Sequence, residues 1–187
     1  MKPYEILPNK EIIGNSEVEK AFLKLGIKDL HNACEYVTRL PYGRTSDKTN
    51  FMQVLPEGRG SCSTKHALIA SLAAELAIDV QLMLGIYMMC EANTPGVEKV
   101  LANSGCVALP EAHCYLKYRD QRIDLTRLTV ADREPIIEFI HEETIDVSQI
   151  GDYKKTVHQD FMKQWMTEDR FEAIWSLREA CIKVLSG

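Results

Sequence analysis

A cysteine, a histidine and an aspartate in this chain have the chemistry of a covalent acyl-transfer site. Cys62 follows the glycine-rich run Gly58-Arg59-Gly60-Ser61, and His113 and Asp124 come later in the chain. A thiolate can attack a carbonyl carbon, an imidazole can move the protons, and a carboxylate can orient the imidazole and stabilise its cation. The order of these residues therefore predicts a Cys-His-Asp triad that works through an acyl-enzyme thioester.

The position of Cys62 favours its reactive form. The alanine-rich stretch 61–77 predicts a buried helix with Cys62 in its first turn. A free thiol is mostly protonated at neutral pH, because its pKa is about 8.5. The unpaired N–H groups of a helix start favour the thiolate and can hold the oxyanion of a tetrahedral intermediate. We expect the glycine before the cysteine, Gly60, to let a substrate carbonyl approach the backbone closely.

A hairpin can bring the other two residues together. We expect strands over residues 113–118 and 122–125, joined by a turn at Arg119-Asp120. Side chains alternate between the faces of a strand, so a two-residue turn makes His113 and Asp124 diagonal neighbours on one face. A turn of odd length without a bulge would put them on opposite faces. The hypothesis of a triad therefore depends on the length of this turn.

Short motifs around these residues resemble the transglutaminase-like superfamily, whose members share the papain-like fold. The motifs are G-R-G-S-C-S-T-K-H-A-L, then H-C-Y-L-K-Y and I-D-L-T, within residues 55–128. The resemblance implies Cys62 as nucleophile, His113 as general base and acid, and Asp124 as orienting carboxylate. It also implies that the cysteine opens a central helix, while the histidine and aspartate lie on adjacent antiparallel strands. The chain has no room for the accessory domains and calcium sites of animal transglutaminases, so we expect peptidase-like or amidase-like hydrolysis rather than protein crosslinking.

The fold class expected from these patterns is α+β. A central helix of the N-terminal lobe would pack on a small antiparallel sheet, with helices on either side of this core in the sequence. We expect one transglutaminase-like domain over residues 1–187, with a core at about 41–128 and helical flanks at 1–40 and 129–187. Further expected elements are helices at 17–25, 28–39 and 171–185, a strand at 80–89, an irregular loop at 41–60, and an excursion with a short helix at 92–108.

Candidate substrate-binding residues lie on both sides of the nucleophile in the sequence. A side-chain amide from Gln53 or Asn50, in the loop before Cys62, could complete an oxyanion hole. Tyr115 shares the strand face of His113, so it either lines the cleft or packs in the core. We expect Gln53 and Tyr115 to contact substrate.

Two residues near Cys62 in the sequence have competing interpretations. His66 lies one helical turn after Cys62, which allows a local Cys–His dyad or half of a metal site. A metal would need further ligands, so the favoured interpretation is a buried, hydrogen-bonded histidine, with no metal and no cofactor. We expect Lys65 to be solvated or paired with a carboxylate.

Composition excludes several classes of partner. The net charge is −5 and the isoelectric point is about 5.6, so no overall basic field attracts nucleic acid. The N-terminus lacks the apolar core of a signal peptide, and Glu75, Asp79 and Gln81 interrupt the most apolar stretch, so we expect no membrane partner. The six cysteines form no C-x-x-C pair. These features predict a cytoplasmic protein in which most of the other thiols are small buried groups.

The same residues allow other functions. Arylamine N-acetyltransferases use the same order of catalytic residues and a glycine-rich cysteine segment, so an acyltransferase of that kind is an enzymatic alternative. A catalytically silent binding module of the same fold is the alternative outside enzymes. The substrate would be a peptide, a protein or a small amide or ester. The acyl donor, the acceptor and the oligomeric state stay open.

Overall fold

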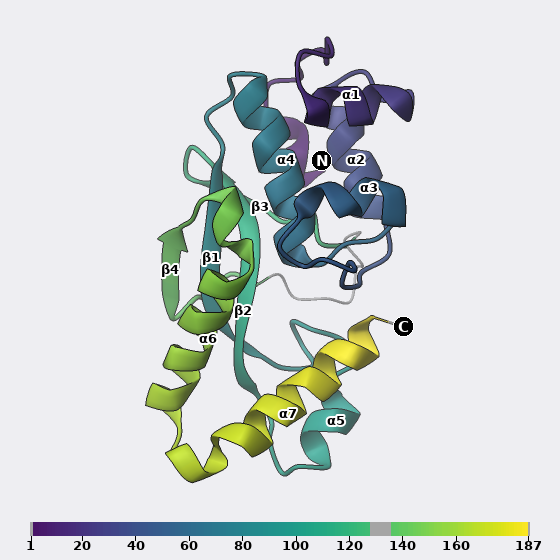
Figure 1. The fold of residues 1–187 in the computed structure, drawn as a ribbon. Coiled ribbons are helices and arrows are strands. Elements are labelled where there is room, and N and C mark those ends of the chain that lie inside the picture. The colour runs from purple at the N-terminus through teal and green to yellow at the C-terminus, as the bar shows by residue number, and fades with distance from the viewer. Residues whose placement is uncertain (1, 128–135, 187) are drawn as a thin grey trace.

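A four-stranded antiparallel sheet and surrounding helices make up the fold, which is of the α+β class. The computed structural model describes residues 2–127 and 136–186 (Figure 1). The strand order is β3-β2-β1-β4, and every neighbouring pair is antiparallel. The strands are β1 (Gln81–Met89), β2 (Leu109–Tyr118), β3 (Gln121–Ile123) and β4 (His141–Thr144).

The helices form two groups at opposite ends of the sheet, and one further helix lies between them. Helices α1 to α4 lie together at one end in Figure 1, α6 lies across the sheet, and α5 and α7 lie together at the other end. The α-helices are α1 (Glu17–Lys24), α2 (Leu30–Arg39), α3 (Val54–Glu57), α4 (Cys62–Glu75), α5 (Glu98–Ala102), α6 (Asp152–Trp165) and α7 (Glu168–Leu185). Short 3₁₀ turns are η1 (Pro3–Ile6), η2 (Phe51–Gln53) and η3 (Val147–Ile150). Each helix in the described part of the chain is too short or too polar to span a bilayer.

The central helix α4 begins at Cys62, as the sequence predicted. The Ser61 side chain caps it by accepting from the Thr64 amide, and Thr64 Oγ1 accepts from the Ser61 amide at 3.1 Å. Nearly all of α4 is buried, because it packs on β1 and β2 on one side and on α1 and α2 on the other. Apolar residues therefore surround it on most sides.

The glycines before α4 serve the backbone and its packing. Gly58 has a φ of +63° and ends α3 in the left-handed conformation, which makes the turn toward α4. A Cβ on Gly60 would lie 2.8 Å from Lys65 Cγ and 3.0 Å from Val54 Cγ2. Close packing therefore requires glycine at this position, and the structure gives that reason in place of the expected approach of a substrate carbonyl.

The β2–β3 hairpin has the two-residue turn on which the triad depends. Tyr118 pairs with Gln121, and Arg119 in the turn has a φ of +52°. Strand β3 pairs only with residues 116–118 of β2. The N-terminal part of β2 therefore extends beyond β3, and it is there that the start of α4 approaches the strand.

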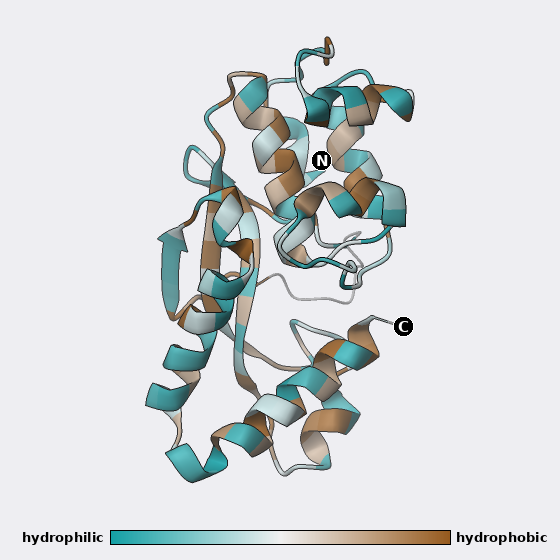
Figure 2. Ribbon diagram, viewed as in Figure 1, coloured by the Kyte–Doolittle hydropathy of each residue, from teal (hydrophilic) through white to brown (hydrophobic). Residues whose placement is uncertain are grey.

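The described residues form two apolar clusters. The larger joins α1, α2 and α4 to one face of β1 and β2, and the smaller joins the ends of β1 and β2 to α5 and α7. Figure 2 shows apolar residues along β1 and β2, whereas the edge strand β4 is hydrophilic. All six cysteines are free thiols, of which Cys34, Cys62, Cys114 and Cys181 are buried and Cys90 and Cys106 are partly exposed.

Parts of the fold differ from the expectations. The segment 41–60, expected to be irregular, contains η2 and α3, and the segment after residue 128 contributes strand β4 as well as helices. Strand β4 reads His-Glu-Glu-Thr, without apolar alternation, because it is held at the sheet edge by backbone pairing with β1. The expected core boundary near residue 128 lies outside the described residues.

Candidate active site

His113 and Asp124 form the predicted hydrogen-bonded pair. Asp124 Oδ2 lies 3.0 Å from His113 Nε2, and Asp124 Oδ1 accepts a hydrogen bond from the Thr126 amide at 2.8 Å. Both carboxylate oxygens are therefore engaged, which fixes the orientation of the carboxylate. This geometry holds the imidazole by Nε2 and leaves its other nitrogen, Nδ1, for the thiol.

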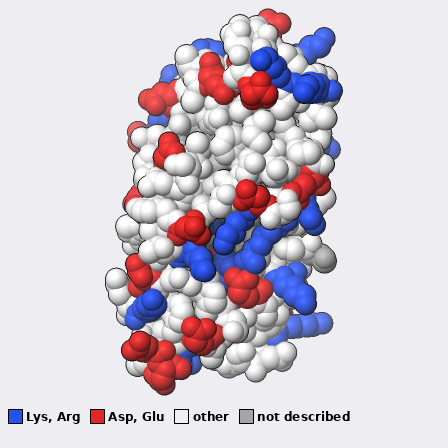
Figure 3. All heavy atoms as spheres, in the orientation of Figure 1, with Lys and Arg blue, Asp and Glu red and all other residues white. Residues whose placement is uncertain are grey.

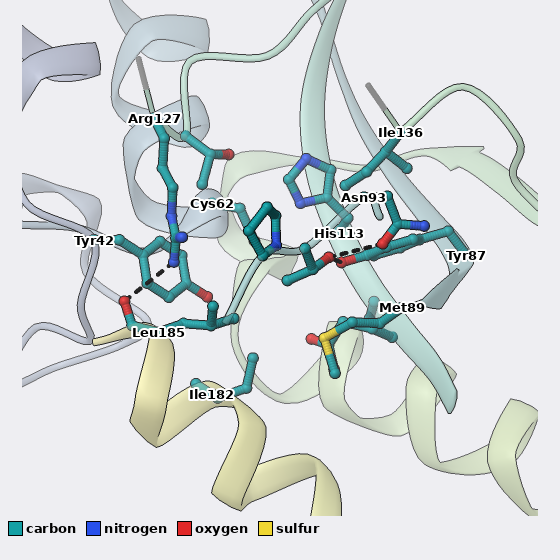
Figure 4. A pocket seen from close by; sticks show the side chains of 15 residues that line it. Tyr42, Cys62, Tyr87, Met89, Asn93, His113, Arg127, Ile136, Ile182 and Leu185 are labelled. Atoms are coloured by element: carbon teal, nitrogen blue, oxygen red, sulfur yellow. Dashed lines mark hydrogen bonds between the residues drawn. The ribbon is translucent and has the colours of Figure 1, made fainter. Parts of the chain in front are cut away.

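Cys62 completes the predicted set. The residue is 6% exposed and stands at the first position of α4, beside the extended part of β2. The His113 side chain and the Cys114 backbone lie near enough to its sulfur to lower the pKa of the thiol. Figure 4 shows Cys62 and His113 close together at the centre of one pocket. The structure thus brings together all three residues predicted to be catalytic.

A lysine that sequence reasoning missed also contacts the sulfur. Lys154 Nζ lies 3.4 Å from Cys62 Sγ and donates to Ser63 Oγ at 2.7 Å. Lys154 comes from α6, which packs against β2. In the sequence Lys154 and Lys155 stand out only as the longest run of basic residues, and no motif connects them to Cys62. The site therefore has a second cation besides the imidazole.

The charges around Cys62 favour the thiolate. Burial raises the pKa of Cys62, but the Lys154 ammonium and the hydrogen bond from His113 oppose burial and lower the pKa to about 5. Burial lowers the pKa of His113, but the charge of Asp124 and its hydrogen bond outweigh burial and raise the pKa to about 9. Between these values the resting pair is thiolate and imidazolium.

His66 ties the helix to the hairpin. Its Nδ1 lies 2.7 Å from the Cys62 carbonyl, and its Nε2 accepts from the Leu125 amide at 2.7 Å. Burial lowers the pKa of His66 to about 4, so the ring is neutral with its proton on Nδ1. The 3.6 Å between His66 Nε2 and Asp124 Oδ1 is consequently no ion pair at neutral pH. The interpretation of His66 as a buried, hydrogen-bonded residue is confirmed.

The described residues do not form a metal site. Among them, no three His, Cys, Asp or Glu side chains gather closely enough to hold a metal ion. Both ring nitrogens of His66 are already used within the protein, as described above.

Two aromatic rings pack against the His113 imidazole. Tyr115 stacks near the imidazole with 6.4 Å between ring centroids, and Tyr87 meets it edge-on at 6.0 Å. Phe139 stacks on Tyr115 and lies over Gly85, where a Cβ would come within 2.3 Å of the phenyl ring. Tyr115 is 2% exposed and its hydroxyl donates to Glu142. Tyr115 therefore packs beside the His113 imidazole and does not line the pockets that reach Cys62.

The other residues predicted near the nucleophile have structural surroundings. Asn50 caps η2 by accepting from the Met52 amide at 3.0 Å, and Gln53 ends that turn. Neither amide lines the pockets next to Cys62. The expectation for Lys65 was wrong: it is fully buried, and its ammonium donates to the Leu40 and Thr126 carbonyls at 2.6 and 2.8 Å. This bond links the hairpin to the segment that follows α2.

Two pockets meet at Cys62. A small one of about 40 Å³ opens on the His113 side, where Tyr87, Met89 and Leu185 are among its walls (Figure 4). A larger one of about 240 Å³ opens on the Lys154 side, toward α6 and α7. The residues shared by both pockets are Tyr42, Cys62, Glu111 and Ile182. A substrate carbonyl at the sulfur would therefore have space on either side.

Comparisons with known proteins identify no relative. No protein-family model, no curated protein and no solved structure matches this chain.

Proposed function

We propose that this protein is a cysteine-dependent acyl-transfer enzyme that hydrolyses an amide or ester bond through a thioester on Cys62. The observation that carries the proposal is the His113–Asp124 hydrogen bond in the pocket that Cys62 also lines, with Lys154 against the Cys62 sulfur at the start of a buried helix. A buried thiol with only a structural role would be expected to have a raised pKa, whereas the pKa of Cys62 is lowered to about 5.

The first step forms the acyl-enzyme. The thiolate of Cys62 attacks the carbonyl carbon, and the carbonyl electron pair moves onto oxygen. The amides of Cys62 and Ser63 belong to the first helical turn and have no intrahelical acceptor, so they can receive the oxyanion. The C–N or C–O bond then breaks, and the His113 imidazolium gives its proton to the leaving group.

The second step releases the acid. Neutral His113 takes a proton from a water molecule as the water attacks the thioester carbonyl. The C–S bond breaks and the thiolate returns to its place between His113 and Lys154. Asp124 keeps the imidazole oriented by accepting from Nε2 in both steps. An amine acceptor in place of water would give transfer rather than hydrolysis.

The fold and location that accompany this proposal are a papain-like, transglutaminase-like architecture and the cytoplasm. Support for the architecture comes from a cysteine at the start of a central helix, and from a histidine on β2 that is hydrogen-bonded to an aspartate directly after the adjacent antiparallel strand β3. Support for the cytoplasm comes from six cysteines that are all free thiols. The proposed substrates are peptides, proteins or small amides or esters.

Alkylation of the thiol tests the proposal directly. Iodoacetamide at pH 6, followed by peptide mass spectrometry, should label Cys62 much faster than a free cysteine peptide, because the thiolate is already the major form. The partly exposed Cys90 and Cys106 serve as internal references within the same chain. Cys62→Ala should remove the fast phase and leave the slow labelling unchanged.

Electrophilic acyl probes then test turnover. A probe ester should form a thioester on Cys62, detected as a mass increase that disappears with time in the wild type. His113→Ala should prevent formation of that thioester. A Cys62 that reacts at pH 6 no faster than the free peptide would refute the activated nucleophile, and with it the proposed function.

A further inference from the structure

The larger pocket beside Cys62 is rich in cationic side chains. In Figure 3 lysine and arginine side chains gather across the middle of the molecule, between the α1–α4 group and the α5–α7 group. The charged residues lining the pocket are Arg44, Lys48, Glu111, Lys154, Lys155, Arg178 and Glu179. Cations thus outnumber carboxylates in this wall, although the chain as a whole is acidic.

Both carboxylates in the pocket are already bound by arginines. Arg178 donates from Nε and Nη2 to the two oxygens of Glu111, both at 2.6 Å. Glu179 receives Arg44 on both oxygens, at 2.8 and 3.0 Å, and Arg178 on one of them at 2.5 Å. This chain of ion pairs is neutral as a whole, because two arginines balance two carboxylates. The arginines therefore serve to pair the two carboxylates, and the lysines are the cations that can bind a ligand.

The lysines of this pocket are the unbalanced charges. Lys48 and Lys155 are exposed, and no carboxylate among residues 2–127 and 136–186 forms an ion pair with either. Lys154 lies deeper, with its ammonium against Cys62 Sγ and Ser63 Oγ. In the resting site the thiolate is the anion closest to this ammonium.

Acylation removes that anion. When the Sγ–C bond forms and the bond to the leaving group breaks, the sulfur becomes part of a neutral thioester, and the His113 proton leaves with the departing group. The nearest carboxylate that remains is then Glu111, whose charge Arg178 already balances, so the partly buried Lys154 ammonium lacks an anion of its own. One negative charge on the acyl group would restore the balance.

We propose that the pocket on the Lys154 side binds a carboxylate carried by the acyl donor, so that the preferred substrates are anionic amides or esters. This inference rests on the function proposed above. Because Lys154 Nζ lies only 3.4 Å from the sulfur, the carboxylate must lie within a few bonds of the reacting carbonyl. The volume of about 240 Å³ accommodates such a group together with the chain that connects it. Lys48 and Lys155 at the outer wall attract the anion as it enters.

A pair of alkylating probes with the same reacting carbon tests this charge preference. Iodoacetate carries a carboxylate next to the reacting carbon, and iodoacetamide carries a neutral amide there. The quantity measured is the iodoacetate-to-iodoacetamide rate ratio at Cys62, divided by the same ratio for a free cysteine peptide. We expect this normalised ratio to be about five or more at 0.01 M ionic strength, where the Debye length is about 30 Å. The ratio should fall toward one at 1 M salt, where the Debye length is only about 3 Å and charges are strongly screened.

Charge variants then locate the effect. The double variant Lys48→Gln/Lys155→Gln should lower the normalised ratio by roughly threefold to fivefold, as expected for two nearby charges in a solvated pocket. Lys24→Gln is the matched control, since it makes one such charge change on α1, outside the pocket, and should leave the ratio unchanged. Succinate should slow the labelling of Cys62 by iodoacetamide, whereas succinamide should not.

The possible outcomes of these experiments distinguish failure of the carboxylate pocket from failure of the proposed function. Fast reaction with iodoacetamide but a normalised ratio of one or less would overturn the carboxylate pocket and leave the proposed enzyme standing. A high ratio that persists in the double lysine variant, at 1 M salt and in Lys154→Met would also overturn it, because the preference would then not come from these charges. Slow reaction with both probes would overturn the proposed function, and the carboxylate site with it.

Discussion

Replacing Lys154 by methionine tests how far the second cation activates the thiol. Methionine keeps much of the aliphatic volume on α6 but removes the ammonium that lies 3.4 Å from Cys62 Sγ. The thiolate then keeps His113 as its cationic partner. Since a positive charge near a thiol lowers its pKa, the variant should have a Cys62 pKa above the wild-type value of about 5.

The distance sets the size of this change. At 3.4 Å two unit charges attract by about 1 kcal/mol in bulk water and by about 5 kcal/mol at an effective dielectric constant of ~20. One pKa unit corresponds to about 1.4 kcal/mol, so these limits are about one to three and a half units. Lys154 is partly exposed, which favours the lower half of this range. We expect a rise of about one to two pKa units, and hence a labelling rate at pH 6 roughly twofold to tenfold lower.

The assay is the pH dependence of iodoacetamide labelling at Cys62, read by peptide mass spectrometry. Lys154→Arg should keep the midpoint close to the wild-type value, because it restores a cation on α6. Lys24→Met, which removes a charge from α1, should leave the midpoint where it is. If the midpoint of Lys154→Met stays within about 0.3 units of the wild type, the ammonium does not stabilise the thiolate and the electrostatic reasoning is wrong.

Other groups near the site give further predictions. Asp124→Asn removes the charge that raises the pKa of His113 to about 9, so the NMR titration midpoint of this ring should fall by about two units; an unchanged midpoint would contradict the assigned pair. Glu111→Gln leaves the buried guanidinium of Arg178 without its main partner, and urea unfolding should show a loss of about 3–5 kcal/mol, part of which returns in the double variant with Arg178→Leu. Burial lowers the pKa of His66 to about 4, below an unfolded value of about 6.5, so the folded protein should lose up to about 3 kcal/mol as pH falls from ~6.5 to ~4. His66→Asn should be less stable at neutral pH, and the slope of its stability against pH over that range should be shallower; an equal slope would mean that another group is responsible.

The sequence predicted the parts of the site that depend on local geometry. A glycine-rich run before an alanine-rich stretch predicted a helix with Cys62 in its first turn, and that helix is present. The alternation of side chains and a two-residue turn place His113 and Asp124 on one face, and their side chains meet at 3.0 Å. Such rules act over a few residues, so a single chain is enough to apply them.

The elements outside this core were harder to predict because their sequences lack a distinguishing pattern. Strand β4 is polar throughout, and helix α3 has only one turn. Both owe their conformation to the neighbours against which they lie rather than to periodic apolar residues. Helix α6 lies in the flank expected to be helical, but its bounds were not predicted, since few of its residues are buried.

Only the tertiary structure decided what the charged side chains do. Lys65 and Lys154 are both lysines in the sequence, but their surroundings differ. Lys65 is buried and donates to the Leu40 and Thr126 carbonyls, whereas Lys154 lies beside the Cys62 sulfur. The Glu111–Arg178 pair joins a strand and a helix that are distant in the chain. Local sequence determined where the sulfur, the imidazole and the carboxylate could meet. The packing of α6 and α7 determined the electric field around them, because Coulomb forces act through space between groups that chain order does not relate.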